Sequence, residues 1–214
     1  MSELRKSLPP LPSRMTHLPL DRRGYPIPWF VAEVNGERDF RVADARKREL
    51  AARDRRCWVC GEPIGRLVSF VIGPMCAVNR NTSEPGCHRD CAIFSATACP
   101  FLTLPKSDYR GANLPDGVTM PPGALDGNPG VACIWITRAY RPYRVPGSND
   151  WLITLGEPEE VLWYCEGREA TRADVIACLE QRLPLLENVA REEGDEALTL
   201  FKEYVRRAMK LVPA

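Results

Sequence analysis

Six of the nine cysteines and one of the two histidines of this 214-residue chain lie between residues 56 and 102. Cys57 and Cys60 form a C-x-x-C pair, and His88 and Cys91 form an H-x-x-C pair. Thiolate and imidazole are ligands that Zn²⁺ favours, and structural zinc sites hold the ion with a tetrahedron of them. The spacing therefore predicts a zinc site that must bring two separate parts of the chain together.

The residues around each pair predict how its side chains are presented. Gly61 directly follows Cys60 and suits a tight turn in which two thiolates converge, because glycine readily takes a positive φ. His88 and Cys91 are three residues apart, so at the start of a helix they would share one face. With a strand expected at 67–72, the order of knuckle, strand, turn and ligand-bearing helix is typical of a treble-clef zinc finger.

The predicted zinc ligands are Cys57, Cys60, His88 and Cys91. Four protein ligands leave no open position for a substrate, so we expect a structural zinc ion. Cys87 is adjacent to His88 and could replace it, and Cys76 and Cys99 are further candidate ligands. Cys76 and Cys99 could instead be buried thiols that pack as small apolar residues.

The segment before the zinc ligands predicts a hairpin and a helix. Asn35 and Gly36 are flanked by β-forming runs, and Asn-Gly favours a two-residue hairpin because both turn positions need a positive φ. Asp44 can cap a helix over 45–56.

The C-terminal part predicts strands followed by helices. The later β-forming runs are 131–137, 151–155 and 161–165. A helix is expected to begin at Thr171, with Asp174 completing a near capping box, and Pro184 is expected to break or restart it. The fold class is therefore α+β: an N-terminal β-hairpin and helix, a treble-clef-like zinc segment, then a small antiparallel sheet with C-terminal helices.

Proline and glycine divide the chain. Residues 1–20 contain four prolines, and we expect a flexible or surface-draped tail whose LPPLP run could serve as a short ligand. Residues 105–130 contain five prolines and five glycines, which predicts a connector without regular structure. It would separate a zinc-binding domain at 21–104 from an α+β half at 131–214.

Charge is balanced overall but uneven along the chain. The net charge is +1, yet residues 1–56 carry thirteen Lys and Arg against eight Asp and Glu, and residues 114–214 carry eleven against sixteen. The helix after Asp44 is basic, and the run 138–144 interleaves arginine with tyrosine, which can hold phosphates and stack on bases. The predicted nucleic-acid-binding residues are Arg46, Lys47, Arg53, Arg55, Arg56, Arg138, Arg141 and Arg144. The alternative is a set of ordinary solvated faces.

The sequence contains no recognisable catalytic motif. Walker, G-x-G-x-x-G and G-x-S-x-G motifs are absent. HNH-type nuclease chemistry would lack its general base, because His17 in the tail is the only histidine besides His88. No apolar run reaches the length of a membrane span, and the first residues lack the apolar core of a signal peptide. We expect a cytoplasmic protein, and these absences favour a binding protein over an enzyme without deciding between them.

Several segments carry a family resemblance. The motifs are YPIPWFVA, DFRV, CWVCG, FVIGPMCAVNR, EPGCHRDCA and CPFL within 25–104, and WYCEGREATRADVIACLEQRLPLL near the C-terminus. They resemble a family of uncharacterised proteins from phages and GC-rich bacteria. The resemblance implies a mobile-element setting and no particular activity.

Three functions are compatible with these patterns. The first is a zinc-stabilised binding protein whose partner is nucleic acid, a nucleic-acid-processing protein or another host protein. The second is an enzyme that modifies a nucleotide or nucleic acid in a pocket between the two halves, under the 103–130 loop. The third is a protein-interaction or inhibitor module that uses the acidic C-terminal helices.

Overall fold

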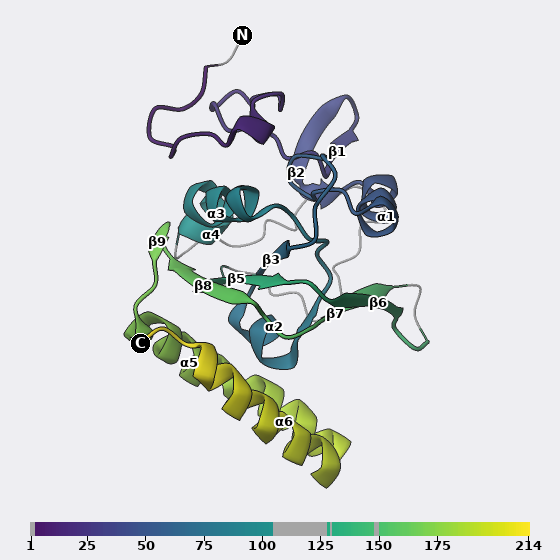
Figure 1. Ribbon diagram of the computed structural model, residues 1–214, viewed down its shortest axis with the longest axis vertical. Coiled ribbons are helices and arrows are strands. Elements are labelled where there is room, and N and C mark those ends of the chain that lie inside the picture. Colours follow the sequence, from purple (N-terminus) through teal and green to yellow (C-terminus); the bar gives the residue numbers. More distant parts are fainter. Residues whose placement is uncertain (1–2, 105–127, 129, 148–149) are drawn as a thin grey trace.

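The structure is a computed structural model that describes residues 3–104, 128, 130–147 and 150–214. Helices and antiparallel sheets follow the α+β order that the sequence predicts (Figure 1). The described part of the 105–130 connector is limited to Asn128 and Gly130, so the remainder of that prediction lies outside the described residues.

The hairpin and first helix form where their local signals predict. The hairpin joins β1 (Val31–Val34) to β2 (Glu37–Ala43), and Asn35 and Gly36 have φ values of 52° and 81°. Helix α1 (Ala45–Asp54) begins after Asp44, whose carboxylate accepts hydrogen bonds from two backbone N–H groups of the first turn. The helix ends two residues before the predicted boundary.

A central antiparallel sheet forms the middle layer. Its strand order is β3 (Val68–Ile72), β5 (Ala132–Thr137), β8 (Glu160–Cys165) and β9 (Arg168–Glu169). Every residue of β5 is buried. Ile134 and Ile136 pack on one side of the sheet, while Cys133 and Trp135 pack on the other. This alternation shows that both faces are covered.

A smaller sheet lies beside the central one. It contains β4 (Asn81–Thr82), β7 (Trp151–Leu155) and β6 (Tyr140–Arg144), in that order. In both sheets, a strand that precedes the 105–130 connector pairs with a strand that follows it. The two predicted halves therefore share these two sheets, whereas the β1–β2 hairpin belongs to the first half alone.

Helices cover the two faces of the central sheet separately. The remaining helices are α2 (Pro74–Asn79), α3 (Arg89–Ala98), α4 (Pro100–Thr103), α5 (Arg172–Glu193) and α6 (Asp195–Ala208), followed by the 3₁₀ turn η2 (Met209–Leu211). Helices α2, α5 and α6 lie on one face, and α3 lies on the other, with α4 beside it (Figure 1). The segment that contains Cys57 and Cys60 shares the α3 side with the N-terminal residues Met15 and Leu18.

The prediction that Pro184 breaks or restarts the C-terminal helix is wrong. Helix α5 continues through Pro184 and ends before Gly194, whose φ is 110°. Proline removes one backbone N–H donor and crowds the carbonyl four residues earlier. The helix tolerates this because Thr171 and Asp174 form a complete capping box and α5 packs along α6. Tertiary packing commonly outweighs such local preferences.

The described part of the N-terminal tail packs against the segment that contains Cys57 and Cys60 and against the start of α3. The 3₁₀ turn η1 (Ser13–Met15) buries Met15 to 1% exposure, and Leu18 is 8% exposed. Both belong to the same apolar cluster as Cys57 and Cys91. Burial of Met15 and Leu18 therefore anchors the middle of this segment.

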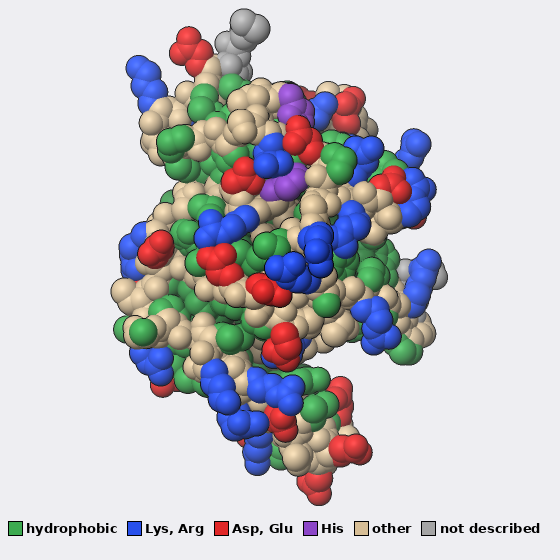
Figure 2. Space-filling view, viewed as in Figure 1, with side chains coloured by type: hydrophobic (Ala, Val, Ile, Leu, Met, Phe, Trp, Pro, Cys, Tyr) green, Lys and Arg blue, Asp and Glu red, His purple; other side chains and the backbone are tan. Residues whose placement is uncertain are grey.

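The surface carries charges of both signs. On the face shown in Figure 2, Lys and Arg side chains are interspersed with Asp and Glu, which agrees with the net charge of +1. Among the helices of the described ranges, none combines the length and apolar character that crossing a bilayer requires.

Candidate metal centre

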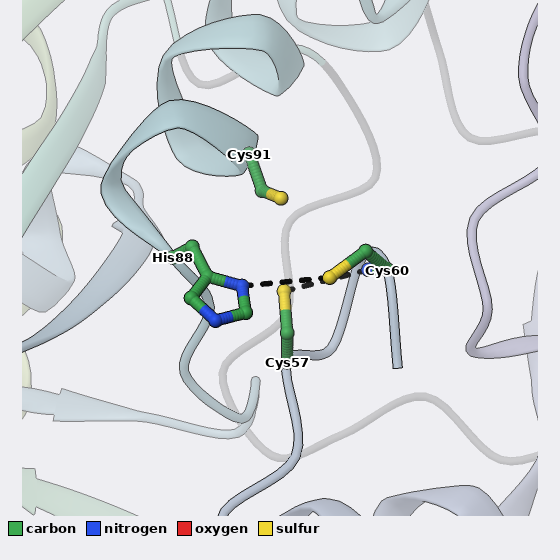
Figure 3. A group of neighbouring side chains, drawn as sticks. All are labelled: Cys57, Cys60, His88 and Cys91. Atoms are coloured by element: carbon green, nitrogen blue, oxygen red, sulfur yellow. Dashed lines mark hydrogen bonds between the residues drawn. The ribbon is translucent and has the colours of Figure 1, made fainter. Parts of the chain in front are cut away.

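Cys57, Cys60, His88 and Cys91 come together between the C-x-x-C turn and the start of α3 (Figure 3). Their ligand atoms all lie within 4.8 Å of one another. The three cysteines are buried, whereas His88 is partly exposed. This group could hold a metal ion, as the spacing of the two pairs predicts.

The C-x-x-C turn is a tight, hydrogen-bonded knuckle. The Cys57 N–H donates to the Glu62 carbonyl at 2.7 Å, and the Gly61 N–H donates to the Cys57 carbonyl at 2.8 Å. Gly61 has a φ of +81°, and a Cβ atom there would lie 2.7 Å from the Trp29 ring. Both the backbone conformation and the contact with Trp29 therefore require glycine.

Backbone hydrogen bonds hold the two ligand pairs in register. The Trp58 N–H in the knuckle donates to the Gly86 carbonyl at 3.0 Å. Cys87 and Ser69 of β3 exchange two backbone hydrogen bonds of 2.7 and 2.9 Å. The chain entering α3 is thus fixed to both the knuckle and the central sheet, which sets the position of His88.

The hydrogen bond of His88 presents the correct nitrogen to a metal. His88 Nε2 lies 3.1 Å from the Pro63 carbonyl. A carbonyl can only accept, so Nε2 carries the proton. The lone pair of Nδ1 then faces Cys60 Sγ, 3.4 Å away. Such an outer hydrogen bond fixes the tautomer and orientation of metal-binding histidines in proteins.

The three thiols compete for protons. Hydrogen bonds from Cys60 and Cys91 hold the pKa of Cys57 well below its ordinary value. The same contact with Cys57 raises the pKa of Cys60 to about 11 and raises that of Cys91 strongly. Metal binding removes this competition, because a cation stabilises all three thiolates together.

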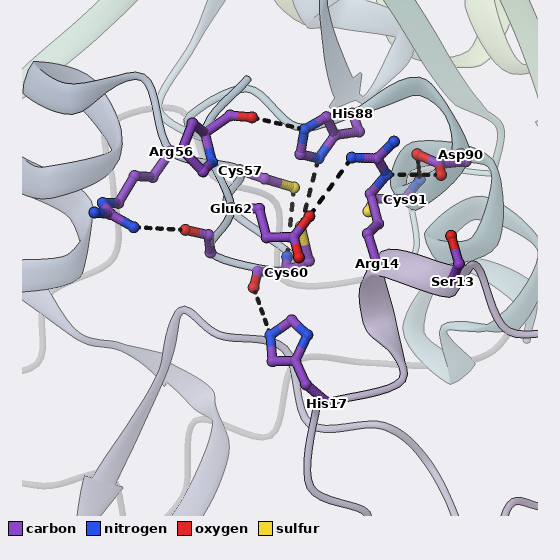
Figure 4. A network of polar contacts seen from close by, with 12 residues as sticks. Ser13, Arg14, His17, Arg56, Cys57, Cys60, Glu62, His88, Asp90 and Cys91 are labelled. Carbon is purple, nitrogen blue, oxygen red and sulfur yellow. Dashed lines mark hydrogen bonds and ion pairs between the residues drawn. The ribbon is translucent and has the colours of Figure 1, made fainter. Parts of the chain in front are cut away.

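The N-terminal segment contacts both ligand pairs from outside (Figure 4). Arg14 Nε donates to Asp90 at 2.9 Å, and Arg14 Nη1 lies 3.6 Å from a Glu62 carboxylate oxygen. His17 Nε2 donates to the Cys60 carbonyl at 3.0 Å. Sequence reasoning missed these contacts, because nothing local to the tail indicates which distant residues it meets.

The three alternative ligands lie outside the group. The Cys87 thiol donates to the Ser69 carbonyl at 3.2 Å, toward β3. Cys76 lies on α2 and packs against the apolar cluster on the other face of the sheet. Cys99 caps α4 at the end of α3. Burial raises the pKa of all three thiols, as expected for thiols that pack as apolar groups.

The predicted basic residues at the start of α1 and near its end differ in their contacts. Lys47 Nζ donates to the Val31 carbonyl at 3.1 Å, and Arg53 forms an ion pair of 2.7 Å with Asp54. Arg46 is exposed. Lys47 and Arg53 therefore have side-chain contacts inside the protein, whereas Arg46 faces solvent.

Arg55 and Arg56 fasten the end of α1 to the knuckle. Arg55 Nη2 donates to the Gly65 carbonyl at 2.8 Å, and Arg56 Nη1 donates to the Gly61 carbonyl at 3.1 Å. The Arg55 guanidinium also lies 5.5 Å from the centroid of the Tyr140 ring on β6. These two arginines link α1, the knuckle and β6.

The arginines of the 138–144 run lie on or beside strand β6. Arg138 forms a 3.0 Å ion pair with Glu159, and Arg141 and Arg144 are exposed. Arg48 of α1 lies 4.2 Å from the centroid of the Trp151 ring on the neighbouring strand β7. The structure thus brings α1 beside the small sheet, so the two basic segments occupy one side of the molecule.

One groove lies next to the metal ligands. It has a volume of about 610 Å³ and runs between the prolines of the N-terminal segment and α3, with Leu67, His88 and Phe94 in its lining. The pocket expected under the 103–130 loop falls largely outside the described residues.

Comparisons with protein-family models, with curated proteins and with solved structures find no match to this chain. Fold and site together define an α+β protein with a group of three cysteines and one histidine that could hold a metal ion. Function is therefore inferred from the geometry of this chain alone.

Proposed function

We propose that this protein is a zinc-stabilised nucleic-acid-binding protein. Zinc holds the fold, and basic residues of α1 and β6 contact the phosphate backbone. The contact of the Arg48 guanidinium with the Trp151 ring, at 4.2 Å, carries the proposal. It joins α1 to the small sheet and so gathers two basic segments, far apart in the sequence, on one side of the molecule.

Zinc is the metal that this donor set favours. Three thiolates and one imidazole form a soft, tetrahedral set that suits Zn²⁺ and leaves no open position. The order of knuckle, β3 and a helix that begins at a ligand pair supports the treble-clef assignment. A closed site of this kind stabilises the fold and performs no chemistry itself.

Three of the predicted basic residues hold backbone carbonyls and serve the fold, namely Lys47, Arg55 and Arg56. Arg46 and Arg141 are exposed and supply the more direct phosphate contacts. The ion pairs of Arg53 and Arg138 are exposed. Such pairs contribute little energy, so a phosphate can replace the carboxylate.

Metal analysis tests the zinc part of the proposal. We expect one equivalent of zinc in the purified chain, and unfolding of the metal-side layer when a chelator removes it. Cys91→Ala should abolish zinc retention. Cys99→Ala, a thiol outside the group, is the matched control and should retain the metal. Zinc retention by both variants would contradict the ligand assignment.

Salt-dependent binding tests the nucleic-acid part. We expect affinity for DNA or RNA to fall as salt rises. Arg46→Glu with Arg141→Glu should weaken binding and reduce the slope of log affinity against log salt by about 2. Arg191→Glu with Arg206→Glu, on α5 and α6, changes the charge equally and should have a smaller effect. Salt-insensitive or absent binding would reject this part.

A second candidate is a protein-interaction module for a host protein. It is supported by three exposed apolar side chains on α5 and α6: Leu185, Val189 and Leu200 are 60%, 51% and 51% exposed. A pull-down that recovers one stoichiometric partner, lost in Leu185→Asp with the fold intact, would favour it. The resemblance to phage and bacterial proteins suits either candidate within a mobile element.

A further inference from the structure

Four side chains converge beside the metal centre from separate parts of the chain. They are Arg48 on α1, Trp58 in the knuckle, Glu84 between β4 and α3, and Trp151 on β7. The Trp58 Nε1–H donates to Glu84 Oε2 at 2.6 Å. Arg48 Nη2 donates to the backbone carbonyls of Ser83 and Trp151, at 2.9 and 3.1 Å.

This cluster contains an acceptor and donors that the protein leaves unused. Glu84 is exposed, and its Oε1 atom accepts no hydrogen bond from the described residues. Arg48 uses only Nη2, so its Nε–H and Nη1–H groups have no acceptor among those residues. Arg48 and Glu84 influence each other electrostatically but form no direct ion pair. Each is therefore available to a ligand.

The surroundings make both charged groups selective. Glu84 is exposed to solvent, yet desolvation by the protein around it raises the pKa of its carboxyl. The hydrogen bond from Trp58 and the charge of Arg48 act in the opposite direction. The Arg48 guanidinium lies over the Trp151 ring, and Phe30 stacks on Trp58 with ring centroids 4.8 Å apart. Charged groups that are partly desolvated discriminate strongly against ligands that leave them unpaired.

The unused groups define the ligand that would satisfy them. It must offer N–H donors to a carboxylate, acceptors to a guanidinium, and a flat face for stacking. Guanine has N1–H and N2–H donors on one edge, which suit the two oxygens of a carboxylate, and the acceptor O6 beside them, to which a single guanidinium N–H can donate. Unpaired bases are also bound by stacking on aromatic rings and guanidinium planes.

We propose that Glu84 and Arg48 form a binding site for an unpaired guanine base of a single-stranded nucleic acid. The site rests on the proposed function, because the basic residues of α1 and β6 would deliver the strand. Arg48 shares α1 with Arg46, and Trp151 pairs with Arg144 across β6 and β7. The base site therefore lies within the same basic side of the molecule.

Base preference tests the site in the full-length, zinc-loaded protein. Short oligothymidines with one central G, A, C or T are compared by fluorescence anisotropy. We expect the central G to bind about tenfold more tightly than the others, the discrimination of one good bidentate contact. Inosine, which lacks the N2 amino group, should bind with intermediate affinity.

Glu84→Gln is the decisive variant. The new amide side chain would keep an acceptor for Trp58 but would place an N–H donor where the guanine edge needs an acceptor. We expect the preference for G to disappear while zinc content and thermal stability stay unchanged. Glu193→Gln on α5, an exposed residue far along the chain, is the matched control and should keep the preference.

The outcomes separate this inference from the proposed function. Salt-dependent binding that is equal for all four central bases overturns the guanine site and leaves the proposed function standing. Absence of binding to every oligonucleotide overturns the proposed function. In that case the base site is tested by calorimetry with GMP and AMP, because neither nucleotide needs contacts along a strand. Equal binding of GMP and AMP overturns the guanine site.

Discussion

Replacing Gly61 in the knuckle by alanine should lower the free energy of unfolding more than replacing Gly36 in the hairpin turn by alanine. Gly61 and Gly36 have the same φ of +81°. At Gly61 a Cβ atom would lie 2.7 and 2.8 Å from two atoms of the Trp29 ring, whereas at Gly36 nothing lies within 4 Å. The pair thus separates backbone strain from steric contact.

The magnitude follows from these two effects. A left-handed conformation costs a residue with a Cβ about 1–2 kcal/mol, and both variants incur it. Overpacking adds about 1–3 kcal/mol at Gly61 only. The Trp29 backbone cannot simply move aside, because its N–H donates to the Val59 carbonyl inside the knuckle at 2.7 Å, so relief of the contact requires the ring to leave its packed position. We expect a loss of about 2–5 kcal/mol for Gly61→Ala and about 1–2 kcal/mol for Gly36→Ala.

Urea unfolding of the zinc-loaded protein measures the two free energies of unfolding. Competition with a chromophoric chelator measures zinc affinity. Gly61→Ala should also weaken zinc binding, because the Gly61 N–H donates to the Cys57 carbonyl and helps to set the spacing of the thiols. Equal destabilisation by the two variants, with zinc affinity unchanged in both, would refute the steric reasoning.

Three further predictions concern separate elements. Met15→Ala should cost about 2–5 kcal/mol of unfolding free energy, because Met15 is 1% exposed; a loss near zero by urea unfolding would mean that the N-terminal segment is not anchored there. Pro184→Ala should raise stability by up to about 3 kcal/mol, because alanine restores a backbone donor in the middle of α5; an unchanged or lower melting temperature would contradict this. The hydrogen bond from Arg168 holds the pKa of Asp174 below its ordinary value, so its stabilisation is present above the ordinary carboxyl pKa and is lost as the pH falls through the lower folded value. Asp174→Asn should therefore destabilise near about pH 7 and have little effect in strong acid, and thermal melts that show the same difference at every pH would disprove the linkage.

Features with a local signal were predictable from the sequence. The Asn35-Gly36 turn and the Asp44 cap each need only neighbouring residues, and both form as expected. The C-x-x-C and H-x-x-C spacings likewise predicted which four side chains would come together. In these cases the chemistry of a few adjacent residues determines the geometry.

Features that depend on distant partners were not predictable. Arg14 meets Asp90 across 76 positions of the chain, and His17 meets Cys60 across 43. Neither contact has a periodic or compositional signal. The continuity of α5 through Pro184 was missed for a related reason, because packing against α6 compensates for an unfavourable local residue.

The metal centre and the proposed base site are mechanically connected, which affects how zinc dependence should be interpreted. Trp58 lies between the ligands Cys57 and Cys60, and its ring donates the hydrogen bond that positions Glu84. Arg56, the residue just before Cys57, donates a hydrogen bond to the Gly61 carbonyl in the knuckle. On the proposed function, loss of zinc should therefore abolish nucleic-acid binding, although none of the proposed strand-contacting residues is a metal ligand. Zinc dependence alone cannot identify a binding residue, whereas a variant that keeps the metal and loses base preference can.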